Sequence, residues 1–201
     1  MNYNKLINKY IEQEVETIKK INVEAVNEVL NLLENSVKND STIYVFGNGG
    51  SAATASHFQN DFNKGVSEYI KKKFRVVCLN DNIATIMAIA NDIGYEEVFR
   101  FQLLDKIKSK DVIIAISCSG NSNNVINAVE YAKSHRCKIV GLTGYSGGKL
   151  KELSDISLHV PINSMQITED IHMIFNHMMV SVFYKSMCGI NHIINKGVDN
   201  E

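Results

Sequence analysis

Residues 4–38 place apolar side chains at the three- and four-residue spacing that is typical of amphipathic helices. The spacing falls into two groups, and neither contains a glycine or proline that would interrupt a helix. The sequence therefore predicts two N-terminal helices. Their apolar positions are Leu6, Ile7, Tyr10, Ile11, Val15 and Ile18 in the first, and Val26, Val29, Leu30, Leu33 and Val37 in the second.

After residue 40 the pattern changes to short apolar runs separated by long intervals. Strands that are apolar on both faces and alternate with helices indicate a parallel sheet covered on both sides. We predict an α/β fold: a three-layer, open, parallel five-stranded sheet with helices on both faces and two extra N-terminal helices. The predicted strands are 42–46, 74–79, 112–117, 138–142 and 156–160, and the predicted helices are 51–63, 82–92, 95–107, 122–135, 148–153 and 166–187.

The length of 201 residues fits one large domain. Pro161 is the only proline, so the chain has no proline-rich linker. We expect the N-terminal helices, residues 1–40, to belong to the same domain as residues 41–195. Residues 196–201 are expected to form a frayed tail.

Composition narrows the class of protein. The formal net charge is −1, which argues against a sequence-independent nucleic-acid binder because such a protein needs a basic face. The four cysteines form no CxxC pair and are expected to be reduced thiols in a cytoplasmic protein. No run approaches the about 20 apolar residues of a membrane span, and the charged N-terminus does not resemble a signal peptide. We therefore expect no membrane association.

Two polar loops follow predicted strands at the carboxyl edge of the sheet, where open parallel sheets bind ligands. In residues 47–51 (Gly-Asn-Gly-Gly-Ser) glycines allow backbone amides to approach an anion, and Ser51 is expected to cap the next helix. The loop matches neither a P-loop nor a dinucleotide fingerprint, and spacing alone supports a ligand site and a tight turn equally.

Residues 117–122 (Ser-Cys-Ser-Gly-Asn-Ser) hold three serines at a predicted helix start and no lysine or arginine. A helix cap needs one serine, so this loop favours a phosphate monoester held by hydroxyls and backbone amides. A third loop, residues 143–148, could also contact a ligand, but we interpret it as a structural turn leading into a short helix.

Histidines and carboxylates share two predicted helices. His57 and Asp61 are four residues apart and lie on one helix face, as a metal pair or an acid–base pair requires. The last helix carries polar groups among apolar neighbours, and its Asp170 and His177 lie almost on one face. Those polar groups are Glu169, Asp170, His172 and His177. The other three histidines, His135, His159 and His192, have no such setting.

These motifs, taken in order, resemble the sugar isomerase (SIS) fold, which is flavodoxin-like, and within it the phosphoheptose isomerases. The likeness covers nearly the whole chain. It rests on Gly47–Ala53 with His57, Ala90–Glu96, Ser117–Ser122, Leu142–Gly144 with Gly147–Lys149, and the helix carrying His172 and His177.

The resemblance implies an aldose–ketose isomerase that converts sedoheptulose 7-phosphate to D-glycero-D-manno-heptose 7-phosphate for lipopolysaccharide or capsule heptose synthesis. It also implies a homotetramer, in which the N-terminal helices would contribute to assembly. The implied phosphate loop is Ser117, Ser119 and Ser122, and the further substrate-binding residues are Asn48, Gly49, Gly50, Ser51, Asp61, Asn91, Asp92, Cys118 and Glu169. Without the resemblance, Asn91 and Asp92 would be interpreted as the end of a helix.

Zn²⁺ is the implied cofactor, with His57 and His177 as two of its ligands. Two positions depart from the family pattern, because Asp61 stands for a glutamate and Glu169 stands for a glutamine. Asp61 is one methylene shorter, which reduces its reach by about 1.5 Å. With the longer Glu169 compensating for Asp61, the resemblance implies a metal set of His57, Asp61, Glu169 and His177 in this chain, which is still suited to zinc.

Isomerisation needs a base, an acid and stabilisation of an oxyanion as the enediolate forms. We predict that Asp61 and His177 supply the base and the acid, in either order. Two alternatives stay open: a non-enzymatic SIS tetramer that binds a protein such as the replication initiator, and an isomerase of another sugar phosphate. Retention of both His57 and His177 favours an enzyme.

Overall fold

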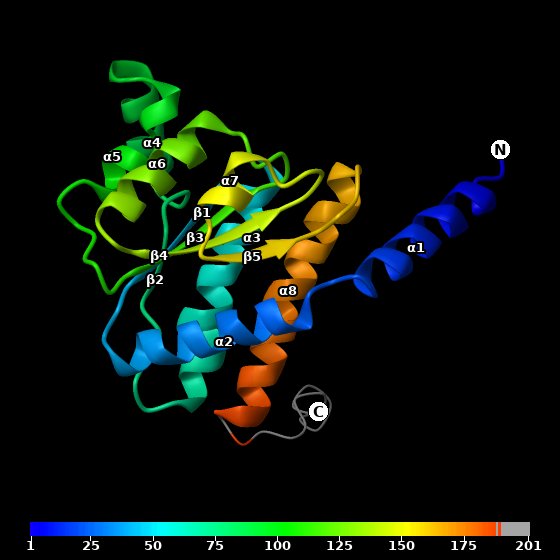
Figure 1. The fold of residues 1–201 in the computed structure, drawn as a ribbon, viewed down its shortest axis with the longest axis horizontal. Coiled ribbons are helices and arrows are strands. Elements are labelled where there is room, and N and C mark those ends of the chain that lie inside the picture. Colours follow the sequence, from blue (N-terminus) through cyan, green and yellow to red (C-terminus); the bar gives the residue numbers. More distant parts are fainter. Residues whose placement is uncertain (188, 190–201) are drawn as a thin grey trace, which may run out of the picture.

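The computed structural model describes residues 1–187 and 189, and a five-stranded parallel sheet runs through its centre (Figure 1). The strands are β1 (Ile43–Gly47), β2 (Val76–Cys78), β3 (Val112–Ser117), β4 (Lys138–Thr143) and β5 (Ile156–His159), in the spatial order β2-β1-β3-β4-β5. The predicted fold class is confirmed. The predicted tail at 196–201, the stretch 190–195 and His192 lie outside the described residues.

The central strands are apolar on both faces because each face is covered. In β1, Ile43 and Val45 belong to one core cluster while Tyr44 and Phe46 belong to the other. Strand β3 alternates in the same way, and all six of its residues are buried. Burial on both sides explains why these strands have no alternating polar positions in the sequence.

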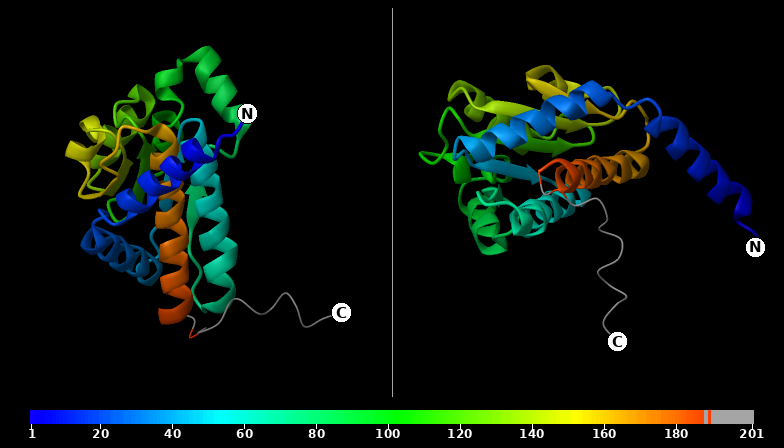
Figure 2. Two further views of the ribbon diagram at one scale, coloured as in Figure 1. Left: turned by 90° about the vertical axis from the view of Figure 1, so that its right-hand side faces the viewer. Right: turned by 90° about the horizontal axis from the view of Figure 1, so that it is seen from below.

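Helices form a layer on each face of the sheet (Figure 2). The first core cluster contains residues of α2 (Val23–Lys38), α3 (Gly50–Asn60) and α8 (Met165–Ser186). The second contains residues of α4 (Ile83–Asp92), α5 (Arg100–Leu103), α6 (Asn123–Ser134) and α7 (Gly148–Leu153). Among the described residues, even the 22-residue α8 lacks the length of apolar sequence that would cross a bilayer.

Helix α1 (Asn4–Ile18) extends away from these layers (Figure 1). Its apolar residues Leu6, Ile7 and Ile11 are 66%, 53% and 53% exposed. The hydroxyl of Tyr10 donates a hydrogen bond to the Asp170 carboxylate of α8, and this bond raises the pKa of Tyr10 to about 12. Tyr10 and Ile18 also pack against the first core cluster, whereas Leu6, Ile7 and Ile11 stay open.

The predicted helix at 95–107 is wrong. That segment forms a 3₁₀ turn (Tyr95–Glu97) and the four-residue α5, and the backbone turns extended at Leu104 before Asp105 adopts a positive φ of 57°. Buried Phe99 and Leu103 have helical spacing, but Val98 and Phe99 reach the core from the turn between the two short pieces and Leu103 from the end of α5. Tertiary packing overrides the local pattern here.

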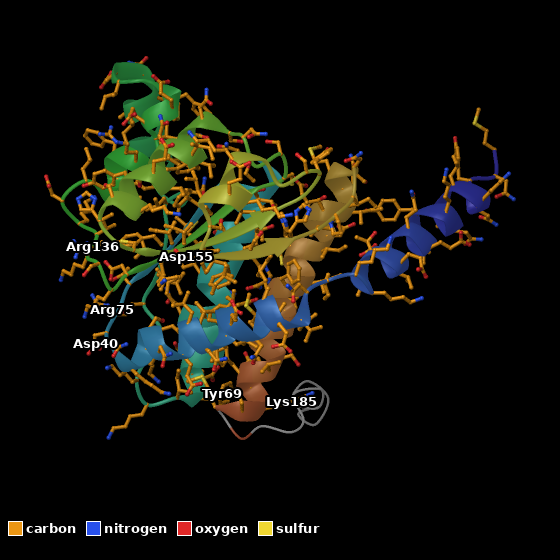
Figure 3. All side chains as sticks on the ribbon, viewed as in Figure 1. Asp40, Tyr69, Arg75, Arg136, Asp155 and Lys185 are labelled. Atoms are coloured by element: carbon orange, nitrogen blue, oxygen red, sulfur yellow. The ribbon has the colours of Figure 1, made fainter. Side chains whose placement is uncertain are left out.

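The two ends of the sheet differ in chemistry. Asp40, Arg75 and Arg136 lie on the left of Figure 3, where the strands begin. The Lys72 ammonium lies 2.9 Å from the Asp40 carboxylate and, by hydrogen bonding, lowers the pKa of Asp40. The glycine- and serine-rich loops leave the opposite, carboxyl end, so the candidate site lies there.

Candidate active site

The first loop turns from β1 into α3 through glycines. Gly49 has φ 54° and ψ −122°, and it rather than Ser51 is the N-cap of α3. Ser51 lies inside the first turn and is 4% exposed, so its predicted capping position is wrong. The turn places a residue with positive φ at the cap, a backbone conformation for which glycine is favoured.

The second loop brings its serines together at the start of α6. The Oγ atoms of Ser117 and Ser122 lie 3.1 Å apart. Ser122 is the N-cap residue, yet its side chain makes no capping hydrogen bond. Its hydroxyl therefore faces the loop, beside the backbone amides of a helix N-terminus, where an anion is favoured.

A cavity of about 260 Å³ lies between the two loops and the start of α8. No lysine or arginine of the part of the chain that the structure describes lines it, so an anion there would be held by hydroxyls and amides. Burial raises the pKa of the Cys118 thiol, and the Glu169 carboxylate raises it further, which keeps the thiol protonated. The lining residues are Asn48, Ser51, Ile116, Ser117, Cys118, Ser119, Ser122, Tyr145, Met165 and Glu169.

The third loop, residues 143–148, and the short helix after it hold the second loop, residues 117–122, through backbone hydrogen bonds. The Gly144 amide donates to the Cys118 carbonyl at 2.8 Å, and the Leu150 amide donates to the Gly120 carbonyl at 2.9 Å. These bonds agree with the structural role predicted for residues 143–148. Tyr145, however, also lines the cavity; the sequence analysis allowed this loop a ligand contact but did not single out Tyr145. An aromatic residue just after a strand's carboxyl end was the available signal.

Replacing Gly120 by Ala is expected to destabilise the protein more than replacing Gly49 by Ala. Both positions have positive φ, 67° and 54°, and each substitution incurs strain of about 1–3 kcal/mol. A Cβ on Gly120 would also overlap the backbone carbonyl of Gly147, whereas one on Gly49 would meet no atom within 4 Å. We expect about 1–3 kcal/mol of additional loss for Gly120→Ala, measured by urea unfolding. Equal losses for the two variants would contradict this packing.

Two histidines and an aspartate converge where α3 meets α8. The Nε2 atom of His57 lies 3.1 Å from Oδ2 of Asp61 and 3.1 Å from Nε2 of His177. His177 Nε2 lies 3.9 Å from the same Asp61 oxygen. Asp61 opens a π-helical turn (Asp61–Gly65), a departure from α-helical geometry that is frequent at functional sites. The donor atoms of these three side chains, the His–Asp–His cluster, lie within 4.8 Å of one another.

Glu169 lies on α8 but outside the His–Asp–His cluster. It is eight residues before His177, which is about 12 Å along a helix. Its carboxylate lines the cavity, 4.0 Å from the Cys118 sulfur. It also lies against Gly50, where any side chain would overlap the carboxylate. The structure thus brings together three of the four predicted metal ligands and directs the fourth towards the loops.

Asn48 is fixed by a side-chain network that the sequence analysis missed. Its amide nitrogen donates to Oδ1 of Asn124, and its Oδ1 accepts from both Asn124 and the Tyr95 hydroxyl, at 2.8–2.9 Å. Asn124 is 2% exposed. These hydrogen bonds join the first loop to α6 and to the segment after α4. The sequence around Asn48 does not indicate that its partner lies at the start of α6.

Asn91 and Asp92 end α4, as their helix-end interpretation predicted. Both are exposed, and the Asn91 amide donates to the Asp92 carboxylate at 2.7 Å. Neither is among the cavity-lining residues. In this single chain the two residues therefore form no contact with the cavity.

His172 and Asp170 also lie apart from the His–Asp–His cluster. His172 is 1% exposed and contacts the Thr143 carbonyl at 3.3 Å, and burial lowers its pKa to about 4. It is thus a neutral core histidine at neutral pH. Asp170 accepts the hydrogen bond from Tyr10.

Known proteins share both the sequence and the fold. Residues 6–144 match the SIS domain family. The phosphoheptose isomerase of Aliarcobacter butzleri (strain RM4018) is 38% identical over 171 residues, 83% of this chain and 89% of that protein. That of Helicobacter pylori (strain ATCC 700392 / 26695) is 40% identical over 156 residues, 78% and 81% respectively. The solved phosphoheptose isomerase from Neisseria gonorrhoeae has a TM-score of 0.84 at 29% identity, covering 92% of this chain and 100% of that one.

Proposed function

Because the chain belongs to the SIS-domain family and, within it, to the phosphoheptose isomerases, we propose that it interconverts sedoheptulose 7-phosphate and D-glycero-D-manno-heptose 7-phosphate. The observation that carries this proposal is that the carboxyl edge of the sheet holds a serine loop suited to phosphate, and that α3 and α8, which border this edge, carry a cluster suited to proton transfer further along their length. The family's named relatives are enzymes, which favours catalysis over a purely protein-binding role.

The serine loop would hold the substrate's phosphate. Ser117, Ser119 and Ser122 offer hydroxyls, and the start of α6 offers backbone amides. We assign the other sugar contacts to cavity residues and to the neighbouring loops. They are Asn48, Gly49, Gly50, Ser51, Cys118 and Glu169, with Asn91 and Asp92 at the end of α4.

The His–Asp–His cluster suits a divalent cation. Two imidazole nitrogens and a carboxylate oxygen within 4.8 Å of one another are a donor set that zinc prefers. We propose that His57, Asp61 and His177 hold Zn²⁺, with Glu169 able to complete the set if its long side chain turns from Gly50 towards His177. A cation held there would supply Lewis-acid polarisation of the sugar carbonyl.

Proton transfer falls to Asp61 and His177. The base removes a proton from the carbon beside the carbonyl, and the acid protonates the carbonyl oxygen, which gives an enediol(ate). The base then returns its proton to the former carbonyl carbon, while the hydroxyl on the adjacent carbon gives its proton back to the acid and becomes the new carbonyl. Asp61 is largely shielded, with its side chain 18% exposed, while that of His177 is 57% exposed and open to substrate. Phosphate anchoring at the serine loop would hold the reacting carbons in place.

Assembly of several copies would cover the apolar side of α1. Leu6, Ile7 and Ile11 are more than half exposed, which is unusual for one face of a helix and supports contact with a second copy. We propose a homotetramer in which residues 1–40 contribute to the interface and belong to the same domain as the sheet. We also propose that the protein acts in the cytoplasm, in heptose synthesis for lipopolysaccharide or capsule.

Turnover of sedoheptulose 7-phosphate by the purified protein, with and without added zinc, tests the activity. For the phosphate assignment, the double variant Ser119→Ala/Ser122→Ala is expected to raise KM about 10–100-fold, because hydrogen bonds to a charged group contribute about 1.5–3 kcal/mol. Ser134→Ala is the matched control, since that hydroxyl lies at the far end of α6 and donates to the Tyr131 carbonyl. An unchanged KM in the double variant would remove the serine loop from phosphate binding.

A further inference from the structure

Asn176 lies directly beneath the His–Asp–His cluster. It precedes His177 on α8 and is 1% exposed. Its Nδ2 donates a hydrogen bond of 2.6 Å to Oδ2 of Asp61 on the neighbouring segment. Helices α3 and α8 lie side by side (Figure 2), so this bond links the two elements that supply the cluster.

The Asp61 oxygen that Asn176 contacts is the same oxygen that faces both histidines. Oδ2 lies 3.1 Å from His57 Nε2 and 3.9 Å from His177 Nε2. A carboxylate attached by a single methylene rotates unless donors hold it, and here one donor comes from its own helix and one from α8. Asp61 also opens the π-helical turn, where the regular direction of side chains is lost.

Packing does not explain an amide at this position. The Oδ1 atom of Asn176 is buried and has no hydrogen-bond partner among the described residues. A buried unpaired oxygen is unfavourable, and a leucine of similar size would avoid it. The feature that the amide provides and a leucine lacks is the hydrogen bond to Asp61.

We propose that Asn176 is a positioning residue that holds the Asp61 carboxylate in place against His57 and His177 for binding a divalent cation. This inference rests on the proposed function, in which these three side chains hold that cation. Outer-shell donors of this kind orient the ligands of a metal, and their loss typically costs 10–100-fold in affinity or activity. Asn176 itself touches neither the substrate nor the cation.

The test compares the full-length Asn176→Leu variant with the unmodified protein, with Co²⁺ as the probe. We expect the dissociation constant for Co²⁺, measured by chelator competition, to rise about 10–100-fold. The visible absorption of the bound Co²⁺ should change, because it reports the geometry of the ligands. At saturating Co²⁺, kcat should fall while KM for sedoheptulose 7-phosphate stays within about twofold, since the phosphate loop is untouched. The metal-free variant should unfold at no lower urea concentration, because an unpaired oxygen has been removed.

Ser36→Ala is the matched control. Ser36 is 3% exposed and donates to the Leu33 carbonyl within α2, so this variant loses a buried hydrogen bond away from the cluster. It should bind Co²⁺ as the unmodified protein does. If Asn176→Leu fails to fold, Asn176→Ala removes the same donor without adding bulk.

The positioning role would be overturned if the folded Asn176 variants bound Co²⁺ with unchanged affinity and absorption. It would also be overturned if the variants lost stability in the metal-free state and showed no change in Co²⁺ binding. Failure of the unmodified protein to bind Co²⁺ would instead overturn the proposed cation site and this inference with it. The unmodified protein's own titration therefore separates the two failures.

Discussion

Asp61→Asn is expected to lower kcat by about 10²–10⁴-fold, the usual contribution of a general acid or base. The amide keeps the size of the carboxylate but cannot accept a proton. In the structure Asp61 Oδ2 lies close to His57, His177 and Asn176, and among the described residues Asp61 is the one carboxylate in the His–Asp–His cluster. Turnover should be measured with excess zinc, so that a weakened metal site does not by itself account for the loss.

Asp170→Asn is the control for this variant. Asp170 lies on α8, is exposed, and accepts a hydrogen bond from Tyr10 outside the cluster. We expect its kcat to match the unmodified protein. Full turnover by Asp61→Asn would contradict the assignment of proton transfer to Asp61.

The sheet could be predicted from sequence because its strands are apolar without interruption. All residues of β3 are buried, and such runs between helical segments are compatible with few other folds. The structure of segment 95–107 could not be predicted, since the spacing of Val98, Phe99 and Leu103 fits one continuous helix as well as it fits two short helical turns. Only the positions of the neighbouring elements decide how those three residues reach the core.

The loops of the candidate site were visible because glycine and serine cluster at strand ends. Likewise, His57 and Asp61 are neighbours on one helix, so their contact follows from a spacing of four. The contact between Asp61 and Asn176 joins residues 115 apart and depends on how α3 and α8 pack. The same holds for Asn48 and Asn124, which are 76 residues apart. Residues that hold a site residue in place through such long-range contacts could therefore not be predicted from the sequence, because no local pattern around an asparagine indicates its partner.

Removal of divalent metal is expected to abolish turnover. If His57, Asp61 and His177 hold Zn²⁺, dialysis against a chelator removes the group that polarises the carbonyl, and returning Zn²⁺ should restore activity. The metal should also stabilise the fold, because it binds the folded chain, by about 2.7 kcal/mol at a concentration 100 times its dissociation constant. Thermal unfolding with and without Zn²⁺ measures this shift.

Variants of the two histidines separate the cation site from other effects of the chelator. His57→Ala and His177→Ala should each lose both the turnover and the stabilisation by zinc, because each removes one of the three donors in the His–Asp–His cluster. His135→Ala should keep both, since His135 is exposed at the end of α6 and contacts Tyr131. Zinc-dependent stabilisation that persists in both His57→Ala and His177→Ala would locate the cation elsewhere. If the unmodified protein keeps its turnover after chelation while the two histidine variants are inactive, the histidines would act in proton transfer and no metal would be needed.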